Sequence, residues 1–186
     1  MAIRPIVTWP DPVLKQRCAE VVAFDADLHQ LLGDMAETMK DEGIGLAANQ
    51  VGVALRVFVM DVPLGEGEHT GVLEIINPRI VKTKGEIRYE EGCLSFPGVN
   101  ETVKRAAEVD LAYQDRHGVE HEVHASGLVA ICIQHELDHL DGIVFLDRLS
   151  PLKRRIALRD YLRENREQIE EAQHRAKSKL RRSAAS

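Results

Sequence analysis

The residues with the clearest chemical potential are two histidines and a glutamate in the last third of the chain. His135 and His139 are four positions apart, so on a helix their imidazoles lie on one face, one turn apart. Glu136 directly follows the first histidine, as in the H-E-x-x-H pattern, where two histidines bind a metal ion and the glutamate acts as general base. The pattern by itself is equally compatible with an exposed helix face that binds nothing.

The element that must position this motif is a helix, and its boundaries can be predicted. Ser126 is a candidate N-cap, and Gly142 stands where a glycine commonly ends a helix. The run from Leu128 to Ile133 is apolar throughout, which is typical of a helix buried on all sides. Histidine and glutamate are rarely buried unless they are paired or bound to something. The apolar approach therefore favours a metal site that is rigid and shielded from water.

A hydrolytic metal site of this kind needs a third protein ligand and an open position for water. Phe145 stands where the longer pattern H-E-x-x-H-x-x-G-x-x-H has its third histidine, and phenylalanine cannot bind a metal. Of the three cysteines, Cys132 lies on the motif's own helix and Cys18 in an irregular segment, whereas Cys93 stands between acidic residues and a Pro-Gly turn. The other candidates are downstream carboxylates: Asp141, Asp147 and Asp160.

Composition limits the class of protein and its compartment. With 186 residues, of which 44% are hydrophobic, the chain is expected to form a single domain over 1–186. It has no run of about eighteen apolar residues that could span a membrane, and its N-terminus lacks the apolar stretch of a secretory signal. Three cysteines at irregular spacing argue against a disulfide framework. We therefore expect a cytoplasmic protein.

Charge is distributed unevenly along the chain. The net charge is −6, yet residues 151–182 hold eleven lysines and arginines against five acidic residues. Within 151–186, a helix is predicted from about Leu152 to Lys179, followed by a fraying end. One face of this helix carries its apolar residues: Leu158, Leu162, Ile169 and Ala172. A basic helix on an acidic body suggests an anionic partner such as the ribosome, and a solvated helix that aids solubility is the alternative. Nothing in the sequence indicates specific DNA binding or a membrane partner.

Hydrophobic periodicity elsewhere predicts an α+β fold. A helix is expected from Asp25 or Asp27 to about Gly43, because apolar residues recur at helical spacing: Leu28, Leu31, Leu32, Met35 and Met39. Strand-like runs separated by turn residues follow: Leu55–Met60, Val72–Ile76, Arg79–Lys82, Glu86–Tyr89, Val109–Tyr113 and Val119–His124. Their short spacing leaves no room for crossover helices, so the sheets should be mostly antiparallel. We expect them to surround a buried central helix that carries the H-E-x-x-H motif, together with an N-terminal helix and a long C-terminal helix.

Residues 43–52 form a chain of small residues that includes an amide, Gln50. Glycines allow a backbone to approach closely, and alanines allow tight packing. The segment lacks the lysine and the glycine spacing of a phosphate-binding loop. We expect a tight turn packed against a neighbouring element, with Gln50 as a hydrogen-bond donor at its end.

Three stretches together resemble the motifs of a known family. They are GIGLAANQ at 43–50, EGCLS at 91–95 and QHELDH at 134–139. In order and spacing they are similar to the three signature motifs of the peptide deformylase family, and the similarity covers nearly the whole chain. The resemblance implies a metal-dependent hydrolase that removes the formyl group from the N-terminal methionine of newly synthesised proteins and releases formate.

The resemblance also implies roles for individual residues. One divalent metal ion, ferrous iron in cells with zinc, nickel or cobalt as substitutes, would be bound by Cys93, His135 and His139. Glu136 would transfer protons during hydrolysis. The Gln50 amide and the backbone N–H of Leu94 would stabilise the oxyanion. N-formylmethionyl nascent peptides would be the substrates.

Substrate selection follows in part from the motif helix. Three residues share a face with the first metal-binding histidine and should form an apolar wall suited to methionine: Leu128, Ile131 and Cys132. Gly45 would let the substrate backbone lie along the small-residue segment. Ile44 and Tyr89 are further candidates for the wall.

Two other functions remain open at this stage. An H-E-x-x-H metallopeptidase would cleave internal amides, but such enzymes use a third histidine or glutamate ligand. A structural zinc site in an RNA-binding module would need four ligands and would leave Glu136 without a function. Hydrolysis of a formyl-methionyl peptide separates both from a deformylase.

Overall fold

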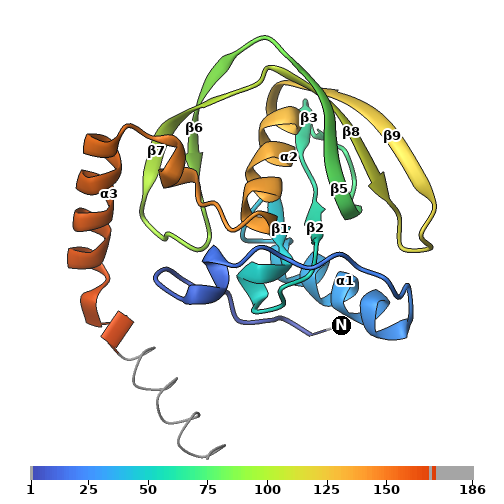
Figure 1. Cartoon of the computed structure of the whole chain (residues 1–186), viewed down its shortest axis with the longest axis horizontal. Coiled ribbons are helices and arrows are strands. Elements are labelled where there is room, and N and C mark those ends of the chain that lie inside the picture. Colours follow the sequence, from blue (N-terminus) through green and yellow to red (C-terminus); the bar gives the residue numbers. More distant parts are fainter. Residues whose placement is uncertain (1, 168, 171–186) are drawn as a thin grey trace, which may run out of the picture.

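The computed structural model describes residues 2–167, 169 and 170 of the chain. Within these residues, helices are combined with antiparallel sheets (Figure 1), which confirms that part of the predicted fold class. The α-helices are α1 (Ala26–Met39), α2 (Gly127–Leu140) and α3 (Pro151–Glu164). Short 3-10 helices are η1 (Pro12–Lys15), η2 (Ala48–Val51) and η3 (Phe145–Arg148). No helix in the described part of the chain is long and apolar enough to cross a membrane.

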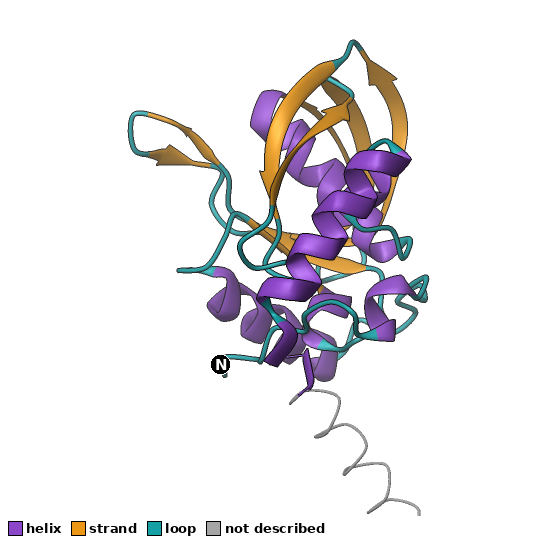
Figure 2. Ribbon diagram, turned by 90° about the vertical axis from the view of Figure 1, so that its left-hand side faces the viewer, coloured by secondary structure: helices purple, strands orange, loops and turns teal. Residues whose placement is uncertain are grey.

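The strands form one larger sheet and two smaller ribbons. They are β1 (Gly45–Ala47), β2 (Val57–Met60), β3 (Pro63–Gly65), β4 (Glu68–His69), β5 (Leu73–Lys84), β6 (Ile87–Gly92), β7 (Asn100–Arg105), β8 (Glu108–Gln114) and β9 (Glu120–Ser126). The larger sheet has the order β1-β2-β5-β8-β9, and every neighbouring pair in it is antiparallel. The ribbon β6–β7 is separate from this sheet, and β3–β4 projects from the body of the molecule (Figure 2).

Helix α1 forms where the periodicity predicts it. Asp25 caps its N-terminus by accepting a hydrogen bond from the Leu28 N–H at 3.1 Å, which satisfies one of the free donors at a helix start. The predicted stripe is buried: Leu28, Leu31, Leu32, Met35 and Met39. The helix ends at Met39 rather than near Gly43, and turn residues lead from it to β1.

The small-residue segment 43–52 contains the predicted tight turn as η2, but a strand, β1, which the sequence-based analysis did not predict, precedes it. Strand β1 pairs with β2 from Gly45↔Met60 to Ala47↔Phe58 and forms one edge of the larger sheet. The chain then turns through η2 to Gly52, whose φ is 81°, a conformation that glycine adopts without strain. The turn brings Gln50 back toward the start of β1.

One long strand replaces two predicted strands. β5 continues through Asn77 and Pro78, where the sequence predicts a turn. Asn77 has a φ of 50°, and its side chain bonds the N–H and the carbonyl of Val21 at 2.8 and 2.9 Å. The register against β8 shifts at this point. The distortion is therefore a bulge held by side-chain hydrogen bonds, beyond which the strand continues. Strands β1, β3, β4 and β7 are absent from the sequence-based prediction.

Helix α2 carries the H-E-x-x-H motif and lies between the larger sheet and the β6–β7 ribbon (Figure 1). It follows Ser126 at its start, and beyond its end Gly142 has a φ of 71°. A Cβ at Gly142 would lie 2.6 Å from the Lys15 carbonyl oxygen, so only glycine fits here. The buried residues of α2 are both apolar and polar: Ala130, Ile131, Cys132, Ile133, Glu136, Asp138, His139 and Leu140.

Helix α3 begins as its sequence predicts, and Leu158 and Ile169 of its predicted apolar face pack against a core cluster. Ser150 caps it by accepting a hydrogen bond from the Lys153 N–H, and Pro151 occupies the first turn. Ala157 and Tyr161 are its buried residues, whereas Leu162, which belongs to the predicted apolar face, is 43% exposed. Tyr161 also donates a hydrogen bond to the Trp9 carbonyl at 2.9 Å, and this polar anchor is not visible in hydrophobic periodicity. Ala172, the end of the predicted helix at Lys179 and the predicted fraying end lie outside the described residues.

Candidate metal centre

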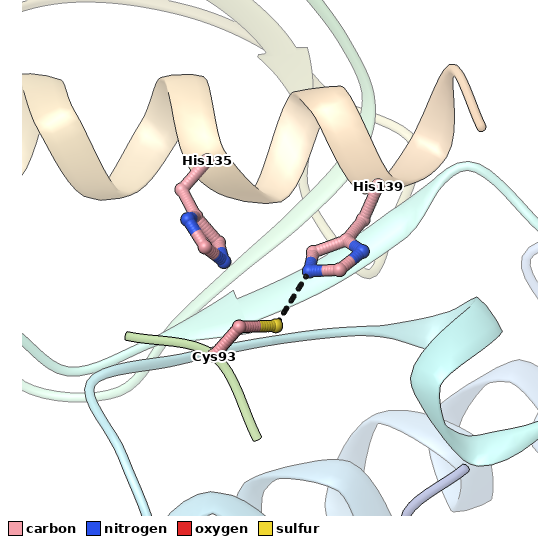
Figure 3. Close-up of side chains that lie close together, drawn as sticks. All are labelled: Cys93, His135 and His139. Carbon is pink, nitrogen blue, oxygen red and sulfur yellow. Dashed lines mark hydrogen bonds between the residues drawn. The ribbon is translucent and has the colours of Figure 1, made fainter. Parts of the chain in front are cut away.

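Helix geometry and the turn after β6 bring three potential metal ligands together. One helical turn separates His135 and His139, whose ring centroids are 5.0 Å apart. Cys93 follows β6 and points its sulfur toward both rings (Figure 3), and its Sγ is 3.2 Å from the Nε2 of His139. One ligand atom from each of the three residues lies within 4.8 Å of the others. Among the described residues this is the only such group of three or more metal-binding side chains.

The donor set fits a divalent transition metal ion. The Nδ1 of His135 is 2.8 Å from the Oε2 of Glu91, so the Nε2 of this ring is left to face the centre. A carboxylate or carbonyl that bonds the other ring nitrogen usually fixes the ring orientation of a metal-binding histidine. Thiolate and imidazole ligands suit iron, zinc, nickel and cobalt better than magnesium or calcium. The residues present therefore fit the metal that the motif predicts.

The structure separates Cys93 from the other cysteines. Cys18 is buried in the core, where burial raises the pKa of its thiol to about 11. Burial, together with the charges of Glu136 and Glu91, raises the pKa of Cys132 well above its ordinary value, so Cys132 remains a neutral thiol. The downstream carboxylates are engaged elsewhere, in ion pairs of Arg56 with Asp141, of Lys15 and Arg154 with Asp147, and of Arg159 with Asp160.

Glu136 lies against the backbone of β1. Its Oε2 is buried and has no hydrogen-bond partner in the described part of the chain. A Cβ built on Gly45 would lie 2.4 Å from the Oε1 of Glu136 and 2.9 Å from the Sγ of Cys132. Burial raises the pKa of Glu136 from 4.5 to about 7. Gly45 thus leaves room for a buried carboxyl that can exchange a proton near neutral pH.

The side-chain amide of Gln50 has a fixed orientation. Its Oε1 accepts a hydrogen bond from the Ala47 N–H at 2.9 Å, so its Nε2 points the other way, 3.2 Å from the Ser95 Oγ and 3.5 Å from the Cys93 Sγ. Ser95 donates to the Val7 carbonyl at 2.7 Å and therefore accepts from Gln50. This arrangement aims an N–H donor at Cys93, one of the three candidate ligands.

The backbone after Cys93 offers a second donor. The Phe96 N–H donates to the Cys93 carbonyl at 2.8 Å and forms a tight turn. The N–H of Leu94 makes no backbone hydrogen bond within the described residues. Leu94 also lines the same cavity as Gln50.

A cavity of about 630 Å³ opens beside two of the three candidate ligands, Cys93 and His135. Its wall contains every residue that the sequence predicts for the substrate site: Ile44, Gly45, Tyr89, Leu128, Ile131 and Cys132. Cys93, His135 and Glu136 also line it, as do Gln50 and Leu94. The cavity therefore joins an apolar wall to the proposed reacting groups.

The sequence-based analysis misses a buried chain of charged residues behind His135. Arg105 donates to Glu91 from Nε at 2.7 Å and Nη2 at 2.9 Å, and to Asp138 from Nη1 at 2.5 Å. Burial raises the pKa of Glu91, but hydrogen bonds from Arg105 and His135 outweigh it and bring the pKa to about 2. Glu91 is thus a carboxylate that holds His135. The acidic residue two positions before Cys93 was the available signal, because metal-binding histidines commonly pair with carboxylates.

Comparison with known proteins gives one consistent result. The family model described as polypeptide deformylase matches residues 3–155. The chain is 49% identical over 168 residues to a peptide deformylase of Syntrophobacter fumaroxidans, and the match covers 90% of this chain and 98% of that one. A peptide deformylase crystal structure from Legionella pneumophila has a TM-score of 0.81 at 45% identity, covering 90% of this chain and 98% of that one. One from Ehrlichia chaffeensis in complex with actinonin has a TM-score of 0.83 at 42% identity, covering 89% and 99%.

Proposed function

The chain belongs to the peptide deformylase family, and we propose that Cys93, His135 and His139 bind its divalent metal ion. As a hydrolase of protein biosynthesis, it removes the formyl group from the N-terminal methionine of newly made proteins and releases formate. The observation that carries the residue assignment is the convergence of a thiol and two imidazoles within 4.8 Å. Glu136, Gln50 and the Leu94 N–H, which surround this centre, are assigned the proton transfer and oxyanion stabilisation.

Glu136 is the proposed general base and then the general acid. A bound divalent metal ion supplies positive charge that polarises the formyl carbonyl and lowers the pKa of the attacking water. Glu136 accepts a proton from that water as the water oxygen bonds to the formyl carbon. When the carbon–nitrogen bond breaks, Glu136 gives the proton to the leaving amine, which leaves formate and a free N-terminus. A pKa of about 7 supports both transfers, because proton exchange is most efficient when the pKa lies near the working pH.

Gln50 and Leu94 are the proposed donors to the oxygen that becomes negatively charged. The Gln50 amide is held in place through Ala47 and Ser95 before substrate arrives, so it needs no reorganisation during the reaction. Loss of one such donor costs about 2.7–4 kcal/mol in comparable acyl-transfer sites. These two donors should therefore contribute strongly to the reaction rate.

The apolar wall is the proposed site for the methionine side chain. Leu128, Ile131 and Cys132 come from α2, and Ile44 and Tyr89 extend the wall from the segments before β1 and in β6. Methionine is flexible and apolar, so it can fill such a cavity without leaving a polar group unpaired. Because β1 is an edge strand, the backbone at Gly45 is proposed to pair with the extended substrate.

Fe²⁺ is the proposed metal in cells, with Zn²⁺, Ni²⁺ or Co²⁺ as substitutes, since a mixed thiolate and imidazole site suits all four ions. We further propose that 1–186 acts as one catalytic domain built around α2 as its buried central helix, and that it works in the cytoplasm. The free thiols of Cys18, Cys93 and Cys132 are compatible with a reducing compartment.

Contact with the ribosome through the basic C-terminal region is a separate proposal. Arg155, Arg159 and Arg163 are exposed on α3, and an anionic partner would be attracted to them. Truncation of α3 is a poor test because Tyr161 is buried. Replacing the three arginines by glutamine should instead weaken salt-sensitive ribosome binding in co-sedimentation without changing peptide hydrolysis. Unchanged ribosome binding would remove this proposal.

A substrate comparison tests the proposed function. Anaerobically prepared protein with Fe²⁺, Ni²⁺ or Co²⁺ should release formate from a formyl-methionyl tripeptide. The same peptide carrying an acetyl group is the matched control and should remain intact, as should the internal amides of an unformylated peptide. Absence of formate with all three metals would exclude the reaction, and cleavage of internal amides would favour a metallopeptidase.

A further inference from the structure

The buried charges behind His135 extend to the protein surface at Arg148. Asp138 accepts hydrogen bonds from the Nη1 of Arg105 at 2.5 Å and from the Nε of Arg148 at 3.0 Å, and the Nη2 of Arg148 contacts its other oxygen. Through Arg105 and Glu91 this connection reaches the Nδ1 of His135. Arg148 stands at the end of η3 and is the outermost member of the series.

Charge balance gives Arg148 a specific task. The side chains of Glu91, Asp138 and Arg105 are 3–5% exposed, so they are screened little by solvent. Two buried carboxylates share the single guanidinium of Arg105, and Arg148 supplies the second positive charge. Without Arg148, Asp138 would attract Arg105 more strongly. The paired hydrogen bonds from Arg105 to Glu91 would then be weakened, because both carboxylates compete for one guanidinium group.

The outer end of this series is accessible. The Arg148 side chain is 45% exposed, and it lines a cavity of about 350 Å³ together with Asp138 and Arg105. This cavity is separate from the one beside the metal ligands, with which it shares no lining residue. A small cation from solution can therefore approach Asp138 without entering the substrate cavity.

We propose that Arg148 is a positioning residue for the metal centre: by pairing with Asp138, it keeps Arg105 bound to Glu91 and so keeps His135 oriented toward the metal. This inference rests on the proposed metal ligands and deepens that assignment. Direct partners of metal-binding histidines change metal affinity by about 10- to 100-fold when mutated. Arg148 acts through three intervening side chains. We therefore expect its replacement to change metal affinity less, by about 3- to 10-fold, judged against that range.

The sign of the change distinguishes positioning from a simple field effect. Removing a positive charge near a cation site should by itself strengthen metal binding. A positioning role predicts the opposite, so Arg148→Ala should weaken Co²⁺ binding, measured by competition with a chelator. Arg154→Ala is the matched control, because Arg154 is 40% exposed, bonds Asp147 and lies six residues away. It loses the same charge without touching the series behind His135.

Chemical rescue completes the test. Guanidinium ion at millimolar concentration should restore part of the Co²⁺ affinity of Arg148→Ala and leave Arg154→Ala unchanged, with equimolar urea and sodium chloride as controls. Arg148→Lys keeps the charge but lacks the planar fork, and it should bind Co²⁺ with intermediate affinity. It also provides the comparison should Arg148→Ala fold poorly. The proposal is overturned if Arg148→Ala and Arg148→Lys bind Co²⁺ as tightly as Arg154→Ala does. Lack of Co²⁺ binding or formate release by the wild-type protein would instead refute the proposed function.

Discussion

Gly45→Ala should inactivate the enzyme while leaving its metal ligands in place. An added Cβ would lie 2.4 Å from the Oε1 of Glu136, whereas ordinary contacts begin at 3.4 Å. Either Glu136 or β1 must therefore move by about 1 Å, and a misplacement of about 1 Å in an active site can cost about 100-fold in rate. That factor corresponds to about 2.7 kcal/mol of transition-state stabilisation. The three atoms nearest to the new methyl group belong to Glu136 and Cys132, not to the proposed metal ligands.

The assay is formate release from a formyl-methionyl tripeptide, with metal content measured on the same samples. Gly43→Ala is the matched control, since its Cβ would meet Leu94 only at an ordinary 3.5 Å, and it should retain wild-type activity. Overpacking at Gly45 should also lower the free energy of unfolding by about 1–3 kcal/mol, which urea denaturation measures. A metal-loaded, folded Gly45→Ala protein with activity within about threefold of wild type, less than 1 kcal/mol in transition-state energy, would refute this reasoning.

Three further variants test other parts of the account. Gln50→Ala should lower kcat by about 100- to 1,000-fold with little change in metal content, because it removes one of the two proposed donors to the developing oxyanion. Glu91→Gln should weaken metal binding by about 10- to 100-fold in chelator competition, since it alters the partner of His135, a proposed metal ligand. A hydrogen bond from the Ala2 N–H is the main interaction that holds the pKa of Asp34 below 3.8. The ionised Asp34 carboxylate therefore contributes to the free energy of unfolding above pH 3.8. This contribution is lost as the pH falls through the lower pKa that Asp34 has in the folded state. Asp34→Asn should be less stable than wild type to urea at pH 7, with a difference that shrinks below pH 3.8.

Local signals predict the motif helix well. The apolar run before His135, the glycine at position 142 and the spacing of the histidines all act within a few residues, and α2 runs from Gly127 to Leu140 as these signals indicate. The caps of α1 and α3 are also local. Long-range order is harder to predict, because the bulge at Asn77 depends on hydrogen bonds to Val21, which is 56 residues away.

The proposed third metal ligand could not be derived from spacing alone. Cys93 is 42 residues from His135, and only the resemblance of three motifs to one family selects it over other cysteines and carboxylates. The strand that supplies Arg105 was also missed. The sequence of β7, NETVKR, is mostly polar, which is typical of a solvent-exposed segment. A buried arginine becomes recognisable only when its carboxylate partners are known in space, as Glu91 and Asp138 are here.

The role of Gly45 was predicted only in part. Small residues at 43–48 indicate tight packing against a neighbouring element, but the sequence-based analysis assigns the close approach at Gly45 itself to the substrate. In the structure, Glu136 and Cys132 of α2 already occupy this space. Glu136, the proposed general base, therefore depends on a glycine 91 positions earlier in the chain, a dependence that periodicity cannot reveal.

The most direct test of the central claim is the absorption spectrum of the Co²⁺-loaded protein and its cysteine variants. If Cys93 binds the metal as a thiolate, wild type, Cys18→Ser and Cys132→Ser should all show a sulfur-to-cobalt charge-transfer band in the near ultraviolet, and Cys93→Ser should lack it. Persistence of the band in Cys93→Ser, or its loss in Cys132→Ser, would contradict the account.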